Sequence, residues 1–464
     1  MIVTAVIAEC NPFHNGHRYL ARKARELTGA DYVVAVMSGP FVQRGAPAVL
    51  DKYTRTQMAL CGGVDLVAEL PAVYALSQAE QFAAGGVRIA DAMGCDFLCF
   101  GCENDNLSCL TAAAQLFNEE PDDYWEVLSG GLRSGLSYPA AREAAACELL
   151  LKRTPEIFSS KEDITGLLQG PNNILAISYL QALLRSGSRM EPVAVKRIGS
   201  GHRDGLLREE KTPRETDPDS VPAPILLAED AVPGTIRSSG SGQRRGKAAP
   251  RIYPSAQAIR EVLTDSIETH RFLSAYPALR SGVPNSTYDL LCDARSRQLF
   301  QTEDDYSVML RYRLLQMNRE EILSCCGQNE DFANRLMHCR SGWNSVTQLT
   351  GLLKHKSRTW SGISRILFRM LLNMDDAAES AAAAAAPYVR VLGMRRDAAP
   401  LLKEWKAAGV PLLINLAEDE KALSAAQMDL LKTDLFAANL YDAVTELKTG
   451  AEPDHEYTRR FLTV

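Results

Sequence analysis

The chain has 464 residues, of which 46% are hydrophobic and 23% charged, so it is long enough for about two to four globular domains. No apolar run approaches the roughly 20 residues that cross a bilayer, and the N-terminal run "MIVTAVIAEC" lacks the basic segment and cleavage site of a signal peptide. The 11 cysteines indicate reduced thiols, and the net charge of -6 disfavours a general polyanion binder. We therefore expect a cytoplasmic protein that does not enter a membrane.

Up to about residue 200, short apolar runs alternate with helical patterns. The intervening stretches, such as "YLARKARELTG", have the spacing of amphipathic helices. Strands separated in this way by helices predict an α/β fold with a doubly wound, Rossmann-like parallel sheet and helices on both faces. The predicted strands are "IVTAVIA" (2–8), "YVVAVM" (32–37), "DLVAEL" (65–70), "DFLCFG" (96–101) and "PVAVKRI" (192–198).

Three further parts complete the chain. Residues 204–249 are rich in Pro, Gly, Ser and charge, which predicts a low-complexity, mobile insertion. The first domain would then combine residues 1–203 with residues 250–268. Residues 269–384 have helical patterns and predict a helical region. Residues 385–464 return to strands and helices, as in "YVRVLGM" and "PLLINL", and predict a small C-terminal α/β domain.

The segment "HNGH" (14–17) lies between the first predicted strand and the helix after it. In a doubly wound sheet this position is at the carboxyl ends of the strands, where such folds bind ligands. A helix start favours phosphate, and Gly16 leaves room for the phosphate to approach the backbone. His14 and His17 can donate hydrogen bonds as charge builds at an α-phosphorus, so we predict catalytic roles for both. The alternative is a pair of surface histidines in a turn.

Polar residues follow other predicted strands at the same edge of the sheet. Gln43 and Arg44, in "SGPFVQRG" (38–45), could hold a carboxylate or a phosphate, and a solvated turn is the alternative. Gly101 permits the close approach of an adenine or a ribose. Arg197 ends the fifth strand and is the preferred phosphate or nucleobase contact.

Lys52 and Arg55 begin the helix that follows the 38–45 loop. Positive charge is unfavourable at a helix N-terminus, so an anionic ligand, a carboxylate or a phosphate, would stabilise both side chains. An ordinary salt bridge with Asp51 would have the same effect, and the sequence leaves both possibilities open.

Residues 340–374 contain no acidic residue and several basic ones. Positive charge follows phosphate, and Trp360, which lies among these residues, could stack on a base, so the pattern predicts an RNA-binding surface. The alternative is a helix whose charges are balanced by neighbours from elsewhere in the fold. The predicted RNA contacts are Lys354, Lys356, Arg358, Arg365 and Arg369.

Cys95, Cys99 and Cys102 are spaced along one predicted strand and the turn after it. No second Cys or His pair follows that could complete a tetrahedral zinc site. We therefore expect buried thiols here and no metal ligands.

These motifs, in this order, resemble one known family. "ECNPFHNGH" resembles the HxGH loop of the nucleotidyltransferase superfamily, and "VVAVMSGPFVQRGAPAVLDKYTRTQMAL" and "GVDLVAELP" resemble the tRNA(Met) cytidine acetate ligases within it. The similarity continues through "CFGCEND", "GPNNILAISYLQAL", "VAVKRIGSGH", "PSAQAIR" and "YVRVLGM". The resemblance implies an ATP-dependent ligase that forms acetyl-adenylate from acetate and passes the acetyl group to the wobble cytidine of elongator tRNA(Met). Residues 1–203 and 250–268 would form the catalytic nucleotidyltransferase-like domain, and residues 269–384 would bind tRNA.

The resemblance also implies a set of ATP contacts. One of Asn172 and Asn173 would contact the nucleotide, although both could instead cap the following helix. Ser255 and Arg260, in "SAQAIR", would face the β- and γ-phosphates, and a plain helix N-terminus is the alternative. Mg²⁺ would be carried with the nucleotide. The N-terminal loop would supply the other contacts, namely Ala8, Glu9, Cys10, Asn11, Pro12, Phe13, His14, Asn15, Gly16 and His17.

The sequence departs from the family pattern at three places. Cys10 stands where an aromatic residue is common, the insertion separates "KRIGSGH" from "PSAQAIR", and "KSRTWSG" replaces a basic motif that usually contains tyrosine. Two other functions stay open: a nucleotidyltransferase that adenylylates a small phosphorylated metabolite, and a noncatalytic tRNA-binding protein. Acetate-stimulated exchange of pyrophosphate into ATP would exclude the first, and any ATP turnover would exclude the second.

Overall fold

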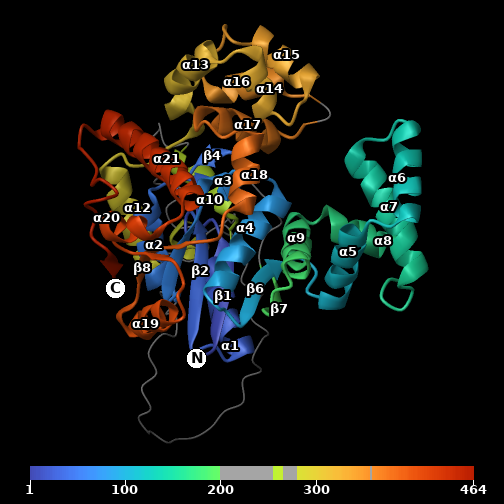
Figure 1. Ribbon diagram of the computed structural model, residues 1–464, viewed down its shortest axis with the longest axis horizontal. Coiled ribbons are helices and arrows are strands. Elements are labelled where there is room, and N and C mark those ends of the chain that lie inside the picture. The colour runs from blue at the N-terminus through green and yellow to red at the C-terminus, as the bar shows by residue number, and fades with distance from the viewer. Residues whose placement is uncertain (199–253, 265–278, 356–357) are drawn as a thin grey trace, which may run out of the picture.

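The computed structural model describes residues 1–198, 254–264, 279–355 and 358–464. The insertion expected at residues 204–249 lies outside these ranges. Figure 1 shows a central sheet, a helical lobe to one side of it, and a second group of helices above the sheet. Within the described ranges, no helix has both the length and the apolar character needed to cross a membrane.

Among the described residues, eight strands form one sheet in the order β10-β8-β5-β2-β1-β6-β7, with β9 beside β8. The N-terminal strands β1, β2, β5, β6 and β7 are parallel, and β1 lies between β2 and β6. These strands confirm the predicted α/β class and the predicted apolar runs. Their bounds are Val3–Ala8 (β1), Tyr32–Ser38 (β2), Leu66–Leu70 (β5), Phe97–Cys102 (β6) and Glu191–Lys196 (β7).

Both faces of this sheet are buried, which explains why its strands are apolar along their length. Val34 and Val36 of β2 face one hydrophobic core, whereas Val33, Ala35 and Met37 face the other. The first core is covered by α4 (Ala79–Ala92) and α9 (Pro171–Ser186), and the second by α1 (Asn15–Thr28) and α2 (Lys52–Cys61). Short elements lie between β2 and α4: β3 (Phe41–Val42), β4 (Ala46–Pro47) and α3 (Ala72–Ala75).

The C-terminal strands extend the same sheet. β8 (Val389–Met394) pairs antiparallel with β5, while β9 (Leu412–Leu413) and β10 (Leu462–Thr463) pair parallel with β8. β8 thereby pairs backbone groups that β5 would otherwise expose at a sheet edge. Residues 385–464 therefore share the N-terminal sheet, contrary to the expectation of a separate small domain, and the sheet is mixed. Their helices are η2 (Arg396–Ala398), α19 (Ala399–Ala407), α20 (Leu416–Asp419), η3 (Glu420–Ala422) and α21 (Ala425–Thr449).

The side lobe is inserted between β6 and β7 (Figure 1). Its helices are α5 (Leu107–Glu119), α6 (Asp122–Arg133), α7 (Tyr138–Arg153) and α8 (Lys161–Gln169).

The upper helices lie at the carboxyl ends of the parallel strands, where Phe41 of β3 contacts the rings of Tyr306 and Phe368 with centroids 5.6 Å apart. This contact brings the helical region predicted from the sequence against the ligand-binding edge of the sheet. The described helices between β7 and β8 are α10 (Ala256–Thr264), α12 (Asn285–Ser296), η1 (Glu303–Tyr306), α13 (Ser307–Gln316), α14 (Arg319–Cys325), α15 (Glu330–His338), α16 (Val346–Leu353), α17 (Trp360–Leu371) and α18 (Asp376–Ala384). Of these, α13 to α17 form the group above the sheet in Figure 1, which we call the upper helices.

Candidate active site

The loop between β1 and α1 crosses the carboxyl edge of the sheet, as the sequence predicts. Asn11 Oδ1 accepts a hydrogen bond from the Val49 amide at 2.8 Å, which fixes the middle of the loop. Cys10 is buried beneath it with φ of 46°, and burial raises the pKa of its thiol to about 12. The Asn11 contact therefore fixes the loop backbone, and the buried Cys10 thiol beneath the loop stays uncharged.

The side chains of His14 and His17 both accept backbone amides at the start of α1 and so cap this helix. His14 Nδ1 accepts a hydrogen bond from the Gly16 amide at 3.0 Å, and His17 Nδ1 accepts one from the His14 amide at 3.2 Å. The two rings stack with centroids 3.9 Å apart. Because each Nδ1 is an acceptor, a neutral ring must carry its hydrogen on Nε2. Each imidazole therefore keeps one N–H donor for a ligand.

Both rings are held neutral. Burial lowers the pKa of His14 well below its usual value, and His17, Arg197 and Arg260 lower it further. Burial and Arg197 lower the pKa of His17 to about 3. The same arginine charges would attract a phosphate while the histidines donate hydrogen bonds.

Gly16 is required for a different reason from the predicted one. A Cβ at this position would lie 2.7 Å from His14 Cε1, so the imidazole ring fills the space that was expected to admit a phosphate. The glycine therefore allows His14 to fold back over its own helix start.

Guanidinium groups from separate segments surround this loop. Arg260 of α10 donates to the Asn11 carbonyl oxygen at 2.6 Å. Burial and the nearby charge of Arg44 lower the pKa of Arg260 to about 10. Arg44 donates to Gln257 Oε1 at 3.0 Å, which links the 38–45 loop to α10. Arg44, Arg197 and Arg260 thus place positive charge near two neutral imidazoles, and we call this edge of the sheet the crevice.

Ser255 acts locally. Its Oγ accepts the Ala258 amide at 3.1 Å and so satisfies the start of α10. This is the plain helix N-terminus that the sequence left open, whereas Arg260 from the same motif reaches the HNGH loop.

Asn172 and Asn173 differ in their surroundings. Asn173 is buried, and its Oδ1 accepts the amides of Glu103 and Asn104 at 2.9 and 3.0 Å. Asn172 Oδ1 accepts a hydrogen bond from Arg197 Nη1 at 3.2 Å, so it is the asparagine nearer the crevice. Neither side chain caps α9.

Gly101 lies beside Arg197. A Cβ at Gly101 would come within 3.4 Å of Arg197 Cγ. That distance is an ordinary van der Waals contact, so the neighbouring atoms give no steric reason for a glycine here.

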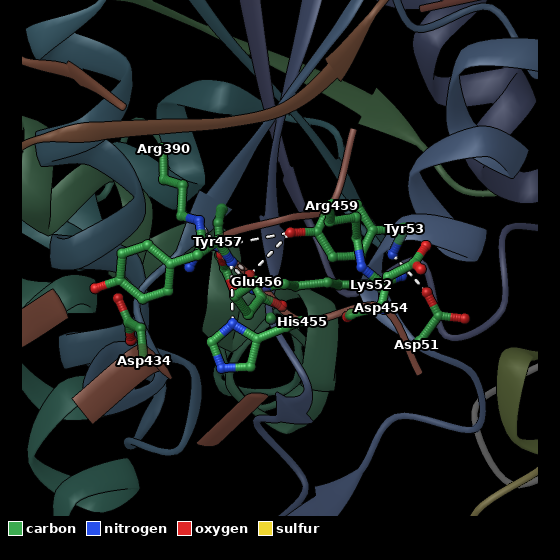
Figure 2. Close-up of polar contacts among 12 residues, drawn as sticks. Asp51, Lys52, Tyr53, Arg390, Asp434, Asp454, His455, Glu456, Tyr457 and Arg459 are labelled. Atoms are coloured by element: carbon green, nitrogen blue, oxygen red, sulfur yellow. Dashed lines mark hydrogen bonds and ion pairs between the residues drawn. The ribbon is translucent and has the colours of Figure 1, made fainter. Parts of the chain in front are cut away.

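The expected ligand contact of Lys52 is corrected by the structure (Figure 2). Lys52 Nζ lies 2.9 Å from both carboxylate oxygens of Glu69 and 3.2 Å from Glu456 Oε2, and all three side chains are buried. Arg390 also contacts Glu69 and Glu456. Burial alone would raise the pKa of Glu456, but Lys52 and Arg390 lower it to about 2. Buried carboxylates rather than a ligand therefore balance Lys52.

Arg55 is also corrected. It is fully buried and donates to the carbonyl oxygens of Leu50, Glu9, Ser38 and Gly39. These bonds join the ends of β1 and β2. Asp51 instead caps α2 through the amides of the two residues at 53 and 54. Arg55 therefore holds the two loops together and does not face the crevice.

Gln43 connects the crevice to the upper helices. The backbone amide of Gln43 donates a hydrogen bond to Glu9 Oε1 at 3.0 Å, and its backbone carbonyl oxygen accepts one from Arg365 Nη1 at 3.0 Å. The 38–45 loop therefore lies between the HNGH loop and α17.

The predicted RNA contacts do not form one surface. Arg369 is buried and pairs with Glu379 at 2.7 Å, so the alternative of an internally balanced charge holds for this residue. Arg365 instead donates to the Gln43 carbonyl oxygen of the 38–45 loop. Arg358 lies over the ring of Phe332 at 4.7 Å, and Lys354 is exposed. Lys356 lies outside the described residues.

The thiols of Cys95, Cys99 and Cys102 are free and buried, as predicted. Burial raises the pKa of Cys99 and Cys102 to about 12. In the described part of the chain, no three His, Cys, Asp or Glu side chains cluster in a way that could hold a metal ion.

The sequence missed the buried charges of Arg390 and Glu456, and also Glu303, whose charge acts on Arg260. Arg390 lies inside the strand motif "YVRVLGM", and its charge in an apolar run was the one available signal. Glu303 begins the acidic run "EDD" (303–305), which matches no motif, so no local signal distinguished it.

Comparison with known proteins finds relatives over nearly the whole chain. The family model of the HIGH Nucleotidyl Transferases matches residues 1–213 and 225–455. The tRNA(Met) cytidine acetate ligase of Clostridium kluyveri is 32% identical over 454 residues, 96% of each chain, and that of Acetivibrio thermocellus is 31% identical over the full length of both.

Solved structures give the same result. Thermotoga maritima TmcAL without ligand has a TM-score of 0.81 and 26% identity, and TmcAL bound with alpha-thio ATP has a TM-score of 0.79 and 25% identity; each match covers 100% of both chains. The chain therefore belongs to the tRNA(Met) cytidine acetate ligase family of the HIGH nucleotidyl transferases.

Proposed function

We propose that this protein uses ATP to activate acetate as acetyl-adenylate and then transfers the acetyl group to the wobble cytidine of elongator tRNA(Met), giving N4-acetylcytidine. The observation that carries this proposal is the pairing of His14 and His17 as neutral N–H donors within a positive crevice. Support also comes from the relatives named for this activity and from the neighbour that binds an ATP analogue.

The first step is attack of an acetate oxygen on the α-phosphorus of ATP, with pyrophosphate leaving. Negative charge grows on the α-phosphoryl oxygens in this transition state, and preorganised N–H donors stabilise it. The Nε2–H groups of His14 and His17 supply such donors. Arg197, Arg260 and Arg44 would bind the carboxylate and the remaining phosphates.

Mg²⁺ would arrive with the nucleotide. His14, His17, Arg44, Arg197 and Arg260 offer N–H donors to phosphate oxygens, whereas Mg²⁺ prefers oxygen ligands. The phosphates and water would therefore provide most of its ligands. Because the proposed substrates are ATP and a tRNA, we place the reaction in the cytoplasm.

For tRNA, the exposed Lys354 and Trp360 at the edge of the upper helices are the preferred contacts. These helices meet the crevice through the 38–45 loop, so a tRNA bound to them could present its anticodon there.

The test of the adenylation step is exchange of labelled pyrophosphate into ATP by the purified protein. We expect exchange that depends on acetate and needs no tRNA. Exchange that requires a phosphorylated metabolite instead would identify a metabolite adenylyltransferase. RNA binding with no ATP turnover at any acetate concentration would identify a noncatalytic binder.

A further inference from the structure

Acetyl transfer to cytidine requires a proton acceptor. The exocyclic amine is a weak nucleophile because its lone pair is delocalised into the ring, so its attack is assisted by removal of a proton. His14 and His17 do not fit this role, because their Nδ1 atoms accept amide hydrogens and their Nε2 atoms are protonated. The acceptor is therefore to be sought among the carboxylates around the crevice.

Three of these carboxylates are held by other contacts. Glu9 Oε1 accepts the Gln43 amide at 3.0 Å. Glu103 accepts three hydrogen bonds from the start of α9, at 2.6, 2.8 and 3.3 Å. Glu261 is exposed and accepts a hydrogen bond from Gln257 at 2.9 Å. Each of them serves the local structure of a loop or helix.

Glu303 lies where the upper helices meet the crevice. Two residues before it, the Gln301 amide donates to the Val49 carbonyl oxygen at 3.1 Å, and the Val49 amide donates to Asn11 of the HNGH loop at 2.8 Å. Glu303 is half-buried at the first position of η1, and its charge acts on Arg260. It is therefore between the nucleotide crevice and the helices proposed to carry tRNA.

We propose that Glu303 is the general base of acetyl transfer, an inference that rests on the proposed function. The lone pair of the cytidine N4 atom forms a bond to the acetyl carbonyl carbon, and the bond from that carbon to the AMP phosphate oxygen breaks. AMP leaves with that electron pair. The N4 proton passes to the Glu303 carboxylate and then to solvent.

The surroundings of Glu303 suit a base. Burial raises its pKa, and Asp304 of the same turn raises it further, whereas the Glu303 backbone amide, Arg260 and Arg44 lower it. The balance is a raised pKa, which makes the carboxylate a stronger proton acceptor.

The experiment isolates the second step by giving the protein preformed acetyl-adenylate and tRNA without ATP. Glu303→Gln is compared with Glu261→Gln, which removes another carboxylate near Arg260 from an exposed position. We expect Glu303→Gln to slow transfer by about 100-fold or more, the usual effect of losing a general base. Glu261→Gln should transfer at the wild-type rate. The wild-type rate should rise with pH as Glu303 ionises, and Glu303→Gln should lack this rise.

Wild-type transfer and pH dependence in Glu303→Gln would overturn the proposal. An equal loss of transfer and of ATP–pyrophosphate exchange would also overturn it, because it would assign Glu303 to the positioning of Arg44 and Arg260. If Glu303→Gln shows no cooperative melt, Glu303→Asp decides: a slower rate that still rises with pH supports the base, and a flat profile excludes it. A wild-type protein that acetylates no tRNA would instead contradict the proposed function.

Discussion

His14 and His17 each use their two ring nitrogens for different purposes. Nδ1 accepts an amide and holds the start of α1, which leaves Nε2–H for the ligand. The residue types and their place after a strand were enough to predict donors to phosphate. The mutual capping was not predictable, because it depends on side-chain rotamers and on the stacking of the rings at 3.9 Å.

Because His14 Nδ1 stabilises the helix start and Nε2–H is left for the ligand, substitutions can separate its effect on folding from its effect on catalysis. At this N-cap, an asparagine side chain can accept the hydrogen bond of the Gly16 backbone amide as the imidazole does, whereas alanine cannot. His14→Ala should therefore lower the free energy of unfolding by about 1 kcal/mol, and His14→Asn should lower it by less. Both variants lose the Nε2–H donor and should lose about 100- to 1000-fold in acetate-dependent exchange. Urea denaturation and the exchange assay measure the two effects. Wild-type exchange in His14→Asn would remove this donor from the chemistry.

The lowered pKa of His17 predicts acid sensitivity. The unfolded chain binds a proton at His17 below about pH 6.5, whereas the folded protein does not until about pH 3. The stability that the neutral ring contributes is therefore present above pH 6.5 and is lost as the pH falls below it. The melting temperature of His17→Asn should fall less than that of wild type between about pH 7.5 and about pH 5. Equal decreases would show that His17 is not held neutral.

At the scale of elements, α17 presses on the loop that carries Gln43 and Arg44. Ser364 Oγ donates to the Gly45 carbonyl oxygen at 2.6 Å, and a Cβ at Gly45 would lie 2.2 Å from the Arg365 amide nitrogen. Gly45 also has φ of 79°. The glycine pair in "SGPFVQRG" predicted a tight loop, but not the helix against it, because that contact joins residues far apart in the chain.

Gly45→Ala tests this contact against Gly63→Ala. Both glycines have positive φ, but a Cβ at Gly63 would meet nothing within 4 Å. Both variants should be destabilised by backbone strain at a positive φ. Only Gly45→Ala should in addition displace α17, so it should melt at a lower temperature than Gly63→Ala and have a higher KM for ATP. Calorimetry and exchange kinetics would contradict this account if the two variants behaved alike.

The buried charges in Figure 2 join the C-terminal segment to the sheet. Glu456→Gln would leave Lys52 and Arg390 short of a negative charge in the interior, and removal of one partner from a buried ion pair costs about 3 to 5 kcal/mol. Glu452→Gln removes an exposed carboxylate four residues earlier and should change little. Urea denaturation should show a large loss of stability for Glu456→Gln alone. A loss no larger than that of the control would mean that these charges are not coupled.

For the whole molecule, the parallel strands were predictable because burial on both faces requires apolar runs. The partner of β8 was not, since a strand pattern does not say which edge it joins. The same limit applies to charge: a run of basic residues predicted one RNA surface, but Arg369 is buried against Glu379. Local patterns thus found the elements and the HNGH loop, while long-range pairing decided which charged residues remain for ligands.

RNA binding is tested with Lys354 and Lys356, each replaced by alanine, with Lys403 and Lys406 of α19 as the control pair. We expect weaker tRNA binding only for the first pair, with the salt dependence reduced by nearly one unit of log–log slope per lost phosphate contact. Acetate-dependent exchange should persist in both, because none of these four lysines belongs to the HNGH loop or to the proposed phosphate contacts. Unchanged affinity and slope in the first pair would move the RNA surface elsewhere.

The most direct test of acetyl transfer to tRNA is nucleoside analysis after incubation with ATP, labelled acetate and elongator tRNA(Met). Wild type should place the label in N4-acetylcytidine at the wobble position only when ATP is present, and His14→Asn should yield almost none in the same time. ATP turnover with no labelled acetylcytidine, or equal labelling by His14→Asn, would contradict the account.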